Sequence, residues 1–443
     1  MRKMLCISAA FLMLAFVVSP VFAQERTRPA ILLKGGHVID PANNINSKMD
    51  ILISKGKIAR VDKNIPASEV GKVVDVSGYY VTPGFIDMHV HCFHTNKKNN
   101  LSIVADGHHF PSGVTTCVDA GTSGASNFEE FKKVIDSSRV RILAFLNIAD
   151  TGMGDDEHEP DHFDVKLAAE TAKKYPDIIV GFKSAHYWRD WFGNHGTTRK
   201  YDEIHTPWAS VDSTVAAGNL AGLPVMIDYN PFPPQGNWPA RSYRGLIIDR
   251  LRPGDIHTHC YARHIPVIEK DGTVNKDIMK ARKRGVIFDV GFGGASIVYR
   301  NAIPAIKQGY IANSISTDLH TGNVNGPVVN MISVMSNFLN MGLSIEDVIR
   351  LSTSEPSRIV NHPELGNLSV GSTADITVTE LLHGDYSYKD TSGGMIKGDK
   401  KLQCMLTVFG GRIVFDPSGL TAPEWKKIPK SDDYWVNPSG QYW

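Results

Sequence analysis

Two histidines separated by one residue end an apolar segment, 84–91, near the start of the chain. A strand has a side-chain period of two, so His89 and His91 point to the same face. Two imidazoles side by side can hold one metal ion, although a pair of ordinary core or surface histidines has the same spacing. The Pro83-Gly84 turn before the segment, and metal-type residues at the ends of later segments, favour the metal site.

Lys183 ends the apolar segment 178–183. A lysine ammonium in the mouth of a barrel is costly, and burial near cations lowers its pKa. The neutral amine can then add CO₂, and the resulting carbamate has two oxygens that can bridge two metals. A solvated lysine at the end of a strand is the alternative, and it would be preferred if Lys183 stood alone.

Asp318 and His259 follow two later apolar segments. A carboxylate at Asp318 could bind metal, and it could also move a proton between water and a leaving group. A helix cap or turn is the ordinary role for such an aspartate. His257 alternates with His259, so both are expected on one face, with His259 as the ligand and His257 as a satisfied core histidine.

These residues must be positioned by a regular framework. The middle of the chain alternates short apolar segments with helical stretches, which predicts an α/β fold built as a (β/α)₈ TIM-like barrel. In such a barrel the chemistry collects at the C-terminal ends of the strands, where all the residues above would lie. The eight predicted strands are 84–91, 115–120, 141–148, 178–183, 225–229, 255–259, 286–290 and 314–318.

Both ends of the chain are instead rich in β patterns. A Gly35-Gly36 turn, a Lys55-Gly56 hairpin and strands at 374–378 and 406–415 predict one small β-sandwich formed from both termini. The predicted domains are a sandwich part at 24–83, the hydrolase barrel at 84–362, and the second sandwich part with a tail at 363–443. Asn127 and the Ser344/Asp347 capping box predict two helix starts.

The first 23 residues predict a secretory signal peptide. A charged start, an apolar core and the small-residue site Val21-Phe22-Ala23 follow in that order. The apolar run is short for a membrane anchor, so the chain is expected to be secreted or periplasmic, without membrane attachment after cleavage. The 47 basic and 46 acidic residues nearly cancel and form no basic stripe, so no nucleic-acid partner is expected. Outside the signal, the cysteines are too few for a disulfide framework and are expected to be buried thiols: Cys92, Cys117, Cys260 and Cys404.

The chain resembles the amidohydrolase superfamily over nearly all of its mature length, most strongly at 81–91, 180–183, 258–260, 291–296 and 316–320. It looks most similar to the dihydroorotase-like amidohydrolase and deacetylase group. That resemblance implies two divalent metal ions, usually Zn²⁺, around a carboxylated lysine. Carried over, His89, His91 and Asp318 would hold the more buried metal, Lys183 would bridge, and His259 would hold the second metal.

One position departs from the family pattern, which has a histidine at the end of the fifth strand where this chain has Asp228. An aspartate can still ligate zinc through oxygen. Its extra negative charge should weaken the metals as Lewis acids and favour a neutral or cationic substrate group beside that metal. Alternatively, Asp228 binds no metal and the second site is weak or empty.

The loops predicted around the barrel mouth are aromatic and basic. Trp188, Trp191, Phe232 and Trp238 could narrow the pocket, although loop packing explains most such aromatics. A carboxylate clamp is predicted from Arg189 or Arg241, with Arg244 nearby. Gly293 and Gly294 could bring backbone close to the substrate, or could serve a packing turn.

The sequence therefore predicts a metal-dependent hydrolase that deacylates a small N-acyl or O-acyl compound through a metal-bound hydroxide, with Asp318 moving the proton. A cyclic amide hydrolase of the dihydroorotase or hydantoinase kind is the first alternative. A non-catalytic barrel used for binding is the second. The expected partner is a small acylated molecule, and a homo-oligomer is compatible with the sequence.

Overall fold

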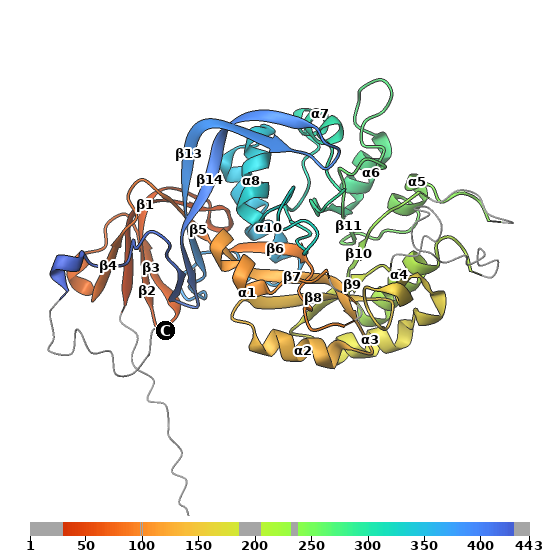
Figure 1. Cartoon of the computed structure of the whole chain (residues 1–443), viewed down its shortest axis with the longest axis horizontal. Coiled ribbons are helices and arrows are strands. Elements are labelled where there is room, and N and C mark those ends of the chain that lie inside the picture. Colours follow the sequence, from red (N-terminus) through yellow and green to blue (C-terminus); the bar gives the residue numbers. More distant parts are fainter. Residues whose placement is uncertain (1–29, 98, 100, 186–204, 232–237, 429–443) are drawn as a thin grey trace, which may run out of the picture.

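The computed structural model describes residues 30–97, 99, 101–185, 205–231 and 238–428. A sheet of strands from both ends of the chain lies beside a larger α/β part (Figure 1). The predicted signal peptide, Arg189, Trp188, Trp191 and Phe232 lie outside the described residues. Among the described residues, no helix is long and apolar enough to cross a membrane.

The smaller part is one mixed, eight-stranded sheet that joins the two ends of the chain. Its order is β15-β14-β13-β5-β1-β2-β3, and β4 pairs with β1. The two predicted β-rich ends therefore meet, in one connected sheet. Its strands are β1 (Ile31–Asp40), β2 (Ile45–Ser54), β3 (Lys57–Asp62), β4 (Lys72–Asp75), β5 (Tyr80–Pro83), β13 (Ile376–Lys389), β14 (Met395–Phe409) and β15 (Arg412–Phe415).

The two glycine-containing turns predicted at the N-terminal end of this sheet have different outcomes. The Lys55-Gly56 hairpin is confirmed: both residues have positive φ, and β2 and β3 pair antiparallel on either side. The predicted turn at Gly35-Gly36 is wrong, because β1 runs through it as one strand with a bulge between Leu33 and Gly36. A glycine pair inside a strand pattern can mark a bulge as well as a turn.

The larger part contains a parallel sheet whose order, β12-β11-β10-β9-β8-β7-β6, follows the chain. Its seven strands are β6 (Phe85–Val90), β7 (Val114–Gly124), β8 (Arg141–Asn147), β9 (Ile179–Lys183), β10 (Val225–Ile227), β11 (Ile256–His257) and β12 (Ile287–Phe288). Seven of the eight predicted strands are thus present.

The eighth predicted strand, 314–318, is not a strand, but its backbone still contacts both edges of the parallel sheet. On one side Ser314 forms a parallel bridge with Asp289, and on the other Leu319 forms a parallel bridge with Val90. The amide of Asp318 donates to the carbonyl of His89 at 2.7 Å. This irregular segment therefore places Asp318 directly beside the two histidines of β6.

Helices cover the parallel sheet: α1 (Ala105–His108), α2 (Phe128–Ser137), α3 (Val165–Lys174), α4 (Ala209–Ala221), α5 (Tyr243–Ile247), α6 (Lys276–Arg284), α7 (Tyr299–Lys307), α8 (Met331–Asn340), α9 (Ile345–Arg350) and α10 (Ser354–Ile359). The Ser344/Asp347 box caps α9 as predicted, with the Ser344 hydroxyl accepting from the Asp347 amide. Asn127 precedes α2, but its side chain accepts from Gly124 and does not cap the helix.

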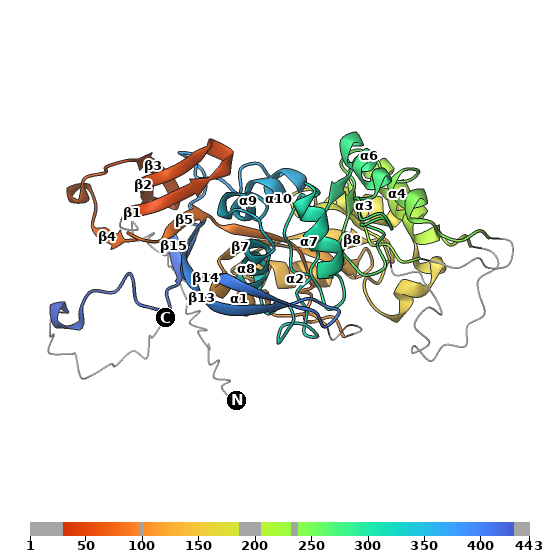
Figure 2. The same ribbon diagram turned by 90° about the horizontal axis from the view of Figure 1, so that it is seen from above.

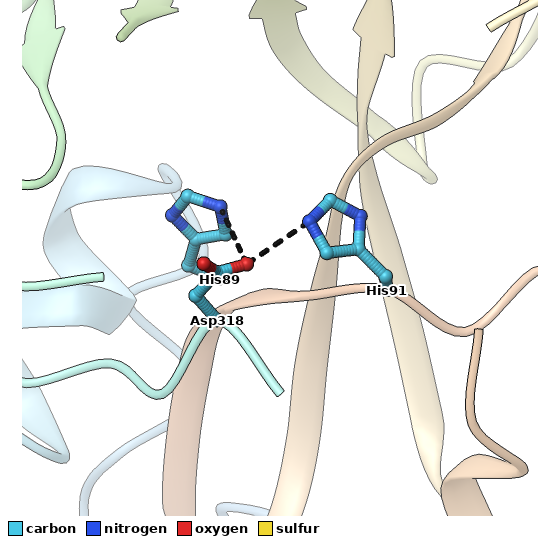
Figure 3. A group of neighbouring side chains, drawn as sticks. All are labelled: His89, His91 and Asp318. Atoms are coloured by element: carbon cyan, nitrogen blue, oxygen red, sulfur yellow. Dashed lines mark ion pairs between the residues drawn. The ribbon is translucent and has the colours of Figure 1, made fainter. Parts of the chain in front are cut away.

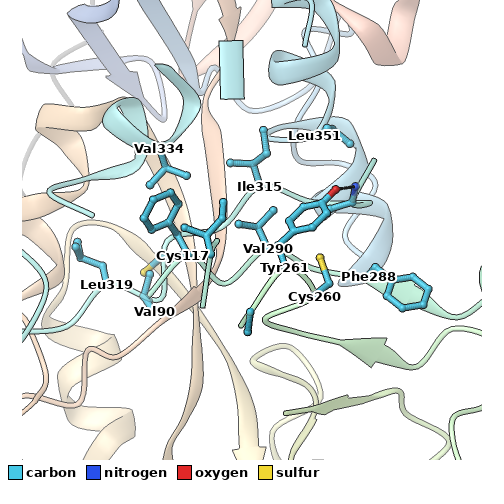
Figure 4. Packing of buried hydrophobic residues seen from close by; sticks show 14 of the residues in the cluster. Val90, Cys117, Cys260, Tyr261, Phe288, Val290, Ile315, Leu319, Val334 and Leu351 are labelled. Carbon is cyan, nitrogen blue, oxygen red and sulfur yellow. Dashed lines mark hydrogen bonds between the residues drawn. The ribbon is translucent and has the colours of Figure 1, made fainter. Parts of the chain in front are cut away.

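Two apolar layers hold the strands in place. One cluster, which includes Met88, Phe145, Met226 and Ile256, consists of residues from the parallel strands and the C-terminal end of α10. A larger cluster joins the strands to the helices, and Figure 4 shows part of it around Tyr261, whose hydroxyl lies 3.1 Å from the carbonyl of Tyr310. The four cysteines outside the signal are free and buried, as predicted.

A long hairpin, β13–β14, was predicted only at its two ends, by the strands 374–378 and 406–415. It leaves the mixed sheet and passes over α8 toward α7 (Figures 1 and 2). At its tip, Asp390 accepts from the Tyr299 amide at 3.0 Å, and Thr391 bonds to the backbone of Ile297. These bonds anchor the chain that follows the Gly293-Gly294 turn.

Candidate metal centre

His89, His91 and Asp318 converge at the end of β6, as Figure 3 shows. Their ligand atoms all lie within 4.8 Å of one another. Oδ1 of Asp318 is 3.0 Å from Nε2 of His91 and 3.5 Å from Nε2 of His89. Both histidines and Asp318 are buried, so the group is sheltered from water. Two imidazoles and a carboxylate in this arrangement are a ligand set that suits zinc.

Hydrogen bonds fix which ring nitrogen of His89 carries the proton. The Thr258 hydroxyl lies 2.9 Å from Nδ1 of His89 and donates its own hydrogen to Asp289 at 2.8 Å. Thr258 can therefore only accept from His89, which places the hydrogen on Nδ1 and a lone pair on Nε2. That lone pair faces the Asp318 carboxylate. Two acceptors facing each other fit a cation between them.

His259 repeats this arrangement beside Asp228. Its Nδ1 lies 2.7 Å from the carbonyl of Gly291, which can only accept, so Nε2 again carries the lone pair. Nε2 of His259 is 3.8 Å from Oδ2 of Asp228, and its ring centre is 5.0 Å from that of His89. His259 and Asp228 thus form a second acceptor pair next to the first, and the donor set fits a second cation.

Burial and neighbouring charges set the protonation of these groups. Burial lowers the pKa of His89 to about 4, despite the opposing effect of Asp318, so its ring is neutral near pH 7. Burial tends to raise the pKa of Asp318, but His89, His91 and His259 hold it well below its ordinary value. A neutral imidazole beside an ionised carboxylate is the state that binds a metal ion.

Lys183 lies at the end of β9 and is buried. Its stem passes close to Gly121, where a Cβ would lie 2.8 Å from the lysine Cβ and Cγ. Within the described part of the chain, no hydrogen bond or ion pair to its ammonium group is present. The positive charge of Lys183 also lowers the pKa of the His89 imidazole. A buried amine beside the histidines is well placed for the predicted carbamate.

Comparison with known proteins bears directly on this centre. Residues 255–414 match the Amidohydrolase family profile. A deacetylase from Agrobacterium fabrum is 30% identical over 376 residues, which cover 83% of this chain and 87% of the relative. The chain belongs to the amidohydrolase superfamily. A deacetylase from Brucella anthropi is 28% identical, covering 88% of this chain and 94% of that protein. This amidohydrolase is therefore a hydrolase that acts on carbon–nitrogen bonds.

Solved structures support the same assignment. The amidohydrolase is similar to an adenine deaminase, with a TM-score of 0.75 and 25% identity, over 87% of this chain and 99% of that one. It is also similar to a dihydroorotase, with a TM-score of 0.72 and 28% identity at the same coverage. Amidohydrolases generally bind divalent metals, and the group formed by His89, His91 and Asp318 is consistent with that property.

His257 does not share the face of His259, so the expected alternation is wrong. His259 has a positive φ of 59°, which breaks the period of two. The ring of His257 packs instead against Tyr243 and Phe288, with ring centres 5.3 and 5.8 Å apart. Thr258, between the two histidines, is the residue that contacts His89. The interpretation of His257 as a core histidine agrees with this packing.

Gly293 approaches a ligand of the centre. It has a φ of 53°, and a Cβ there would lie 2.4 Å from Oδ2 of Asp318. Any side chain would therefore push the carboxylate away. A Cβ on Gly294 would have no described atom within 4 Å. The space that Asp318 needs therefore explains the glycine at 293 but not the one at 294, and the predicted contact of this turn with substrate stays a prediction.

The described arginines of the rim make structural contacts. Arg241 is buried, donates to the carbonyls of Pro207 and Asn230, and lies 5.3 Å from the ring of Trp208. Arg244 is exposed and pairs with Asp277 at 3.4 Å. The predicted carboxylate clamp therefore stays a prediction, and Arg189 lies outside the described residues.

Several residues that surround the ligands were not predicted from the sequence. Thr122, Thr258 and Asp289 hold the two β6 histidines through hydrogen bonds. His320 is also near, with its ring centre 6.3 Å from that of His91, and burial lowers its pKa. His320 could have been found, because it follows Asp318 by two residues. Threonines carry no comparable signal, since they are common in strands.

Proposed function

We propose that this amidohydrolase is an exported enzyme with two divalent metal ions, which removes the acyl group from a small N-acyl or O-acyl compound. The observation that carries the proposal is the pair of histidine lone pairs, on His89 and His259, that face the carboxylates of Asp318 and Asp228. The two deacetylase relatives, at 28% and 30% identity over most of the chain, support the reaction class. Zinc suits ligands of these types.

The proposed ligands divide between two positions. His89, His91 and Asp318 would hold the more buried ion, His259 and Asp228 the other, and a carboxylated Lys183 would bridge them. When bound, such ions polarise a carbonyl and lower the pKa of water. Asp318 would take up the proton of the attacking water and deliver it to the leaving nitrogen or oxygen, because it stays ionised at neutral pH. Gly293 leaves the space that this carboxylate needs.

We also infer that the parallel sheet closes into an eight-fold barrel. The bridges from Ser314 to Asp289 and from Leu319 to Val90 support this closure. A closed barrel would bring the strand ends that carry His89, Lys183 and His259 around one mouth. We propose the same domain limits as the sequence predicted, 24–83, 84–362 and 363–443. The strand bounds support them, since β5 ends at Pro83, β6 begins at Phe85 and β13 begins at Ile376.

The proposal also includes export of the enzyme and a role in using small molecules from outside the cell. The sequence of residues 1–23 supports transport to the periplasm or outside the cell. There a deacylase would act on external small molecules, with neither nucleic acid nor membrane as partner. Localisation of a tagged full-length chain by cell fractionation tests this part separately.

A substrate panel tests the reaction. We expect metal-loaded enzyme to hydrolyse N-acetyl amino acids or acetylated hydroxy acids, and to act more slowly on their uncharged amide analogues if an arginine clamps the carboxylate. Product formation is followed by release of acetate. Unchanged rates after removal of the carboxylate would contradict the clamp, and the absence of acetate from every acylated compound would contradict the deacylase.

Cyclic amide hydrolysis is the second candidate, because a dihydroorotase is similar at 28% identity over 87% of the chain. The same panel therefore includes dihydroorotate, hydantoins and adenine, the last because of the similarity to an adenine deaminase. If only cyclic imides are hydrolysed, the protein is a cyclic amide hydrolase and not a deacylase. Release of ammonia from adenine would identify a deaminase.

Asp228 gives a test of the second metal position. We expect Asp228→Ala to reduce the bound metal from about two ions per chain to about one, because it removes a carboxylate 3.8 Å from Nε2 of His259. Asp228→His is the matched variant: it restores the family pattern and should keep both ions. It should also improve KM for anionic substrates, since a negative charge is lost. Metal content is measured by mass spectrometry, and two ions in Asp228→Ala would show that Asp228 is not a ligand.

A further inference from the structure

Asp289 is a fully buried carboxylate directly behind the metal centre. It follows β12, at the end of the seventh predicted strand, and its exposed fraction is 0%. Its oxygens accept hydrogen bonds from Ser314 at 2.5 Å, Ser316 at 2.7 Å and Thr258 at 2.8 Å. Among the described residues, no lysine or arginine forms an ion pair with it. A buried carboxylate held only by hydroxyl groups and a nearby histidine needs an explanation.

The direction of these hydrogen bonds gives that explanation. Ionised Asp289 can only accept, so the Thr258 hydroxyl must give it its single hydrogen. Thr258 then has only lone pairs left for Nδ1 of His89, at 2.9 Å. Nδ1 of His89 is also 3.6 Å from Oδ2 of Asp289, and Nε2 is 3.5 Å from Oδ1 of Asp318, so the shorter Thr258 hydrogen bond decides where the hydrogen lies. The hydrogen-bond chain from Asp289 through Thr258 thus reaches the ligand itself.

We propose that Asp289 is a positioning residue, which acts through Thr258 to hold His89 in the tautomer and orientation that bind metal. Ser314 and Ser316 fix the Asp289 carboxylate from the irregular segment that also carries Asp318. The same backbone segment therefore supplies one metal ligand and orients another. This inference rests on the proposed role of His89 as a ligand, and it assigns functions to Asp289 and Thr258 that the ligand set alone does not include.

His91 provides an internal comparison. Its Nδ1 lies 2.9 Å from the hydroxyl of Thr122. Within the described residues, however, no acceptor takes the hydrogen of the Thr122 hydroxyl, and the Asp119 carboxylate accepts instead from the amides of Thr122 and Cys92. Thr122 can therefore donate or accept, so its hydroxyl does not fix the tautomer of His91, whose Nε2 faces Oδ1 of Asp318 at 3.0 Å. The Thr258 hydrogen bond thus fixes the tautomer of His89, whereas the Thr122 hydrogen bond does not fix the tautomer of His91.

The experiment compares four single variants and one double variant. Thr258→Val removes the hydroxyl, Thr258→Ser keeps it, Asp289→Asn removes the charge, and Thr122→Val is the matched control on the other histidine. We expect Thr258→Val and Asp289→Asn each to weaken Zn²⁺ binding by about 10–100-fold, the range measured for groups that orient metal ligands. Thr258→Ser should stay within a few-fold of wild type. The double variant Thr258→Val/Asp289→Asn should be no weaker than the weaker single variant, because both act in one chain of hydrogen bonds.

Zinc affinity is measured by competition with a chromophoric chelator, and folding by circular dichroism. Tautomers are read in the metal-free protein by ¹⁵N NMR with labelled histidine, where wild-type His89 should carry its hydrogen on Nδ1 and Thr258→Val should lose that preference. Wild-type affinity in Thr258→Val, or a hydrogen on Nε2 of His89 in wild type, would overturn the proposal. If Asp289→Asn does not fold, the two Thr258 variants decide. Since neither readout uses a substrate, an inactive enzyme with these tautomers would refute only the proposed function.

Discussion

Replacing Lys183 by alanine is expected to remove at least one metal ion per chain and to lower kcat/KM by about 10²–10³-fold, the scale on which loss of one charge-stabilising group acts in an active site. The physical reason is the position of the amine. Lys183 is buried beside His89 and, within the described residues, makes no ion pair. An ammonium group there would repel a metal, whereas a carbamate on the same nitrogen would bind it.

The variant Lys183→Met separates this chemistry from packing. Methionine keeps an unbranched stem of similar length against Gly121 but has no amine that could add CO₂. We expect it to fold like wild type and to lose metal like Lys183→Ala. A short carboxylic acid added to Lys183→Ala should restore part of the activity, because it can occupy the space of the carbamate. Full metal content and activity in both variants would exclude the bridging role.

The carbamate can also be observed directly. Protein prepared with ¹³C-labelled bicarbonate should give a carbonyl resonance that is absent from Lys183→Met. Metal-free protein reconstituted without CO₂ should regain activity more slowly than protein reconstituted with bicarbonate. Equal reactivation under both conditions would indicate that the lysine acts as a free amine.

The sequence predicted the positions of the strand ends well, because apolar runs mark buried parallel strands. Seven of the eight runs are strands, and His89, His91 and Lys183 lie at the ends of β6 and β9 as expected. The period of two was sufficient for His89 and His91, whose ligand atoms lie together although the register of β6 against β7 shifts between Asp87 and Val90. It failed at His257 and His259, because the positive φ of His259 turns its own side chain away from the direction that a regular strand would give it.

Other features depend on contacts between distant segments. The segment 314–318 has the apolar pattern of a strand, but it pairs with the two edges of the parallel sheet only through isolated bridges. Asp318 has a positive φ of 50°, so the backbone is not extended there. Asp289 lies within the predicted strand 286–290 and was not singled out there, and only its burial beside Thr258 and His89 reveals its role. The outer part of β13–β14 alternates between exposed and half-buried residues, so its apolar signal is weak.

The final expected result concerns Asp318, whose replacement by asparagine should lower kcat by about 10²-fold or more, in line with the contribution of general acid–base groups. Asparagine has nearly the same shape and can still occupy the space beside Gly293, but it cannot accept the proton. It also removes a negative charge 3.0 Å from Nε2 of His91, which should weaken metal binding. The measurement is therefore made at saturating metal, with bound metal determined in parallel.

The choice of leaving group separates proton transfer from metal binding. If Asp318 protonates the leaving atom, an acetyl ester of a nitrophenol, whose anion leaves without a proton, should lose less activity in Asp318→Asn than an N-acetyl amine does. If Asp318 only holds the metal, both substrates should slow by the same factor. Asp318→Glu is the matched control, because it keeps a carboxylate and should retain more of the activity toward the amine substrate than Asp318→Asn. An Asp318→Asn variant within a few-fold of wild type on both substrates would show that another group carries the proton, and His320, near His91, would then be the first residue to replace.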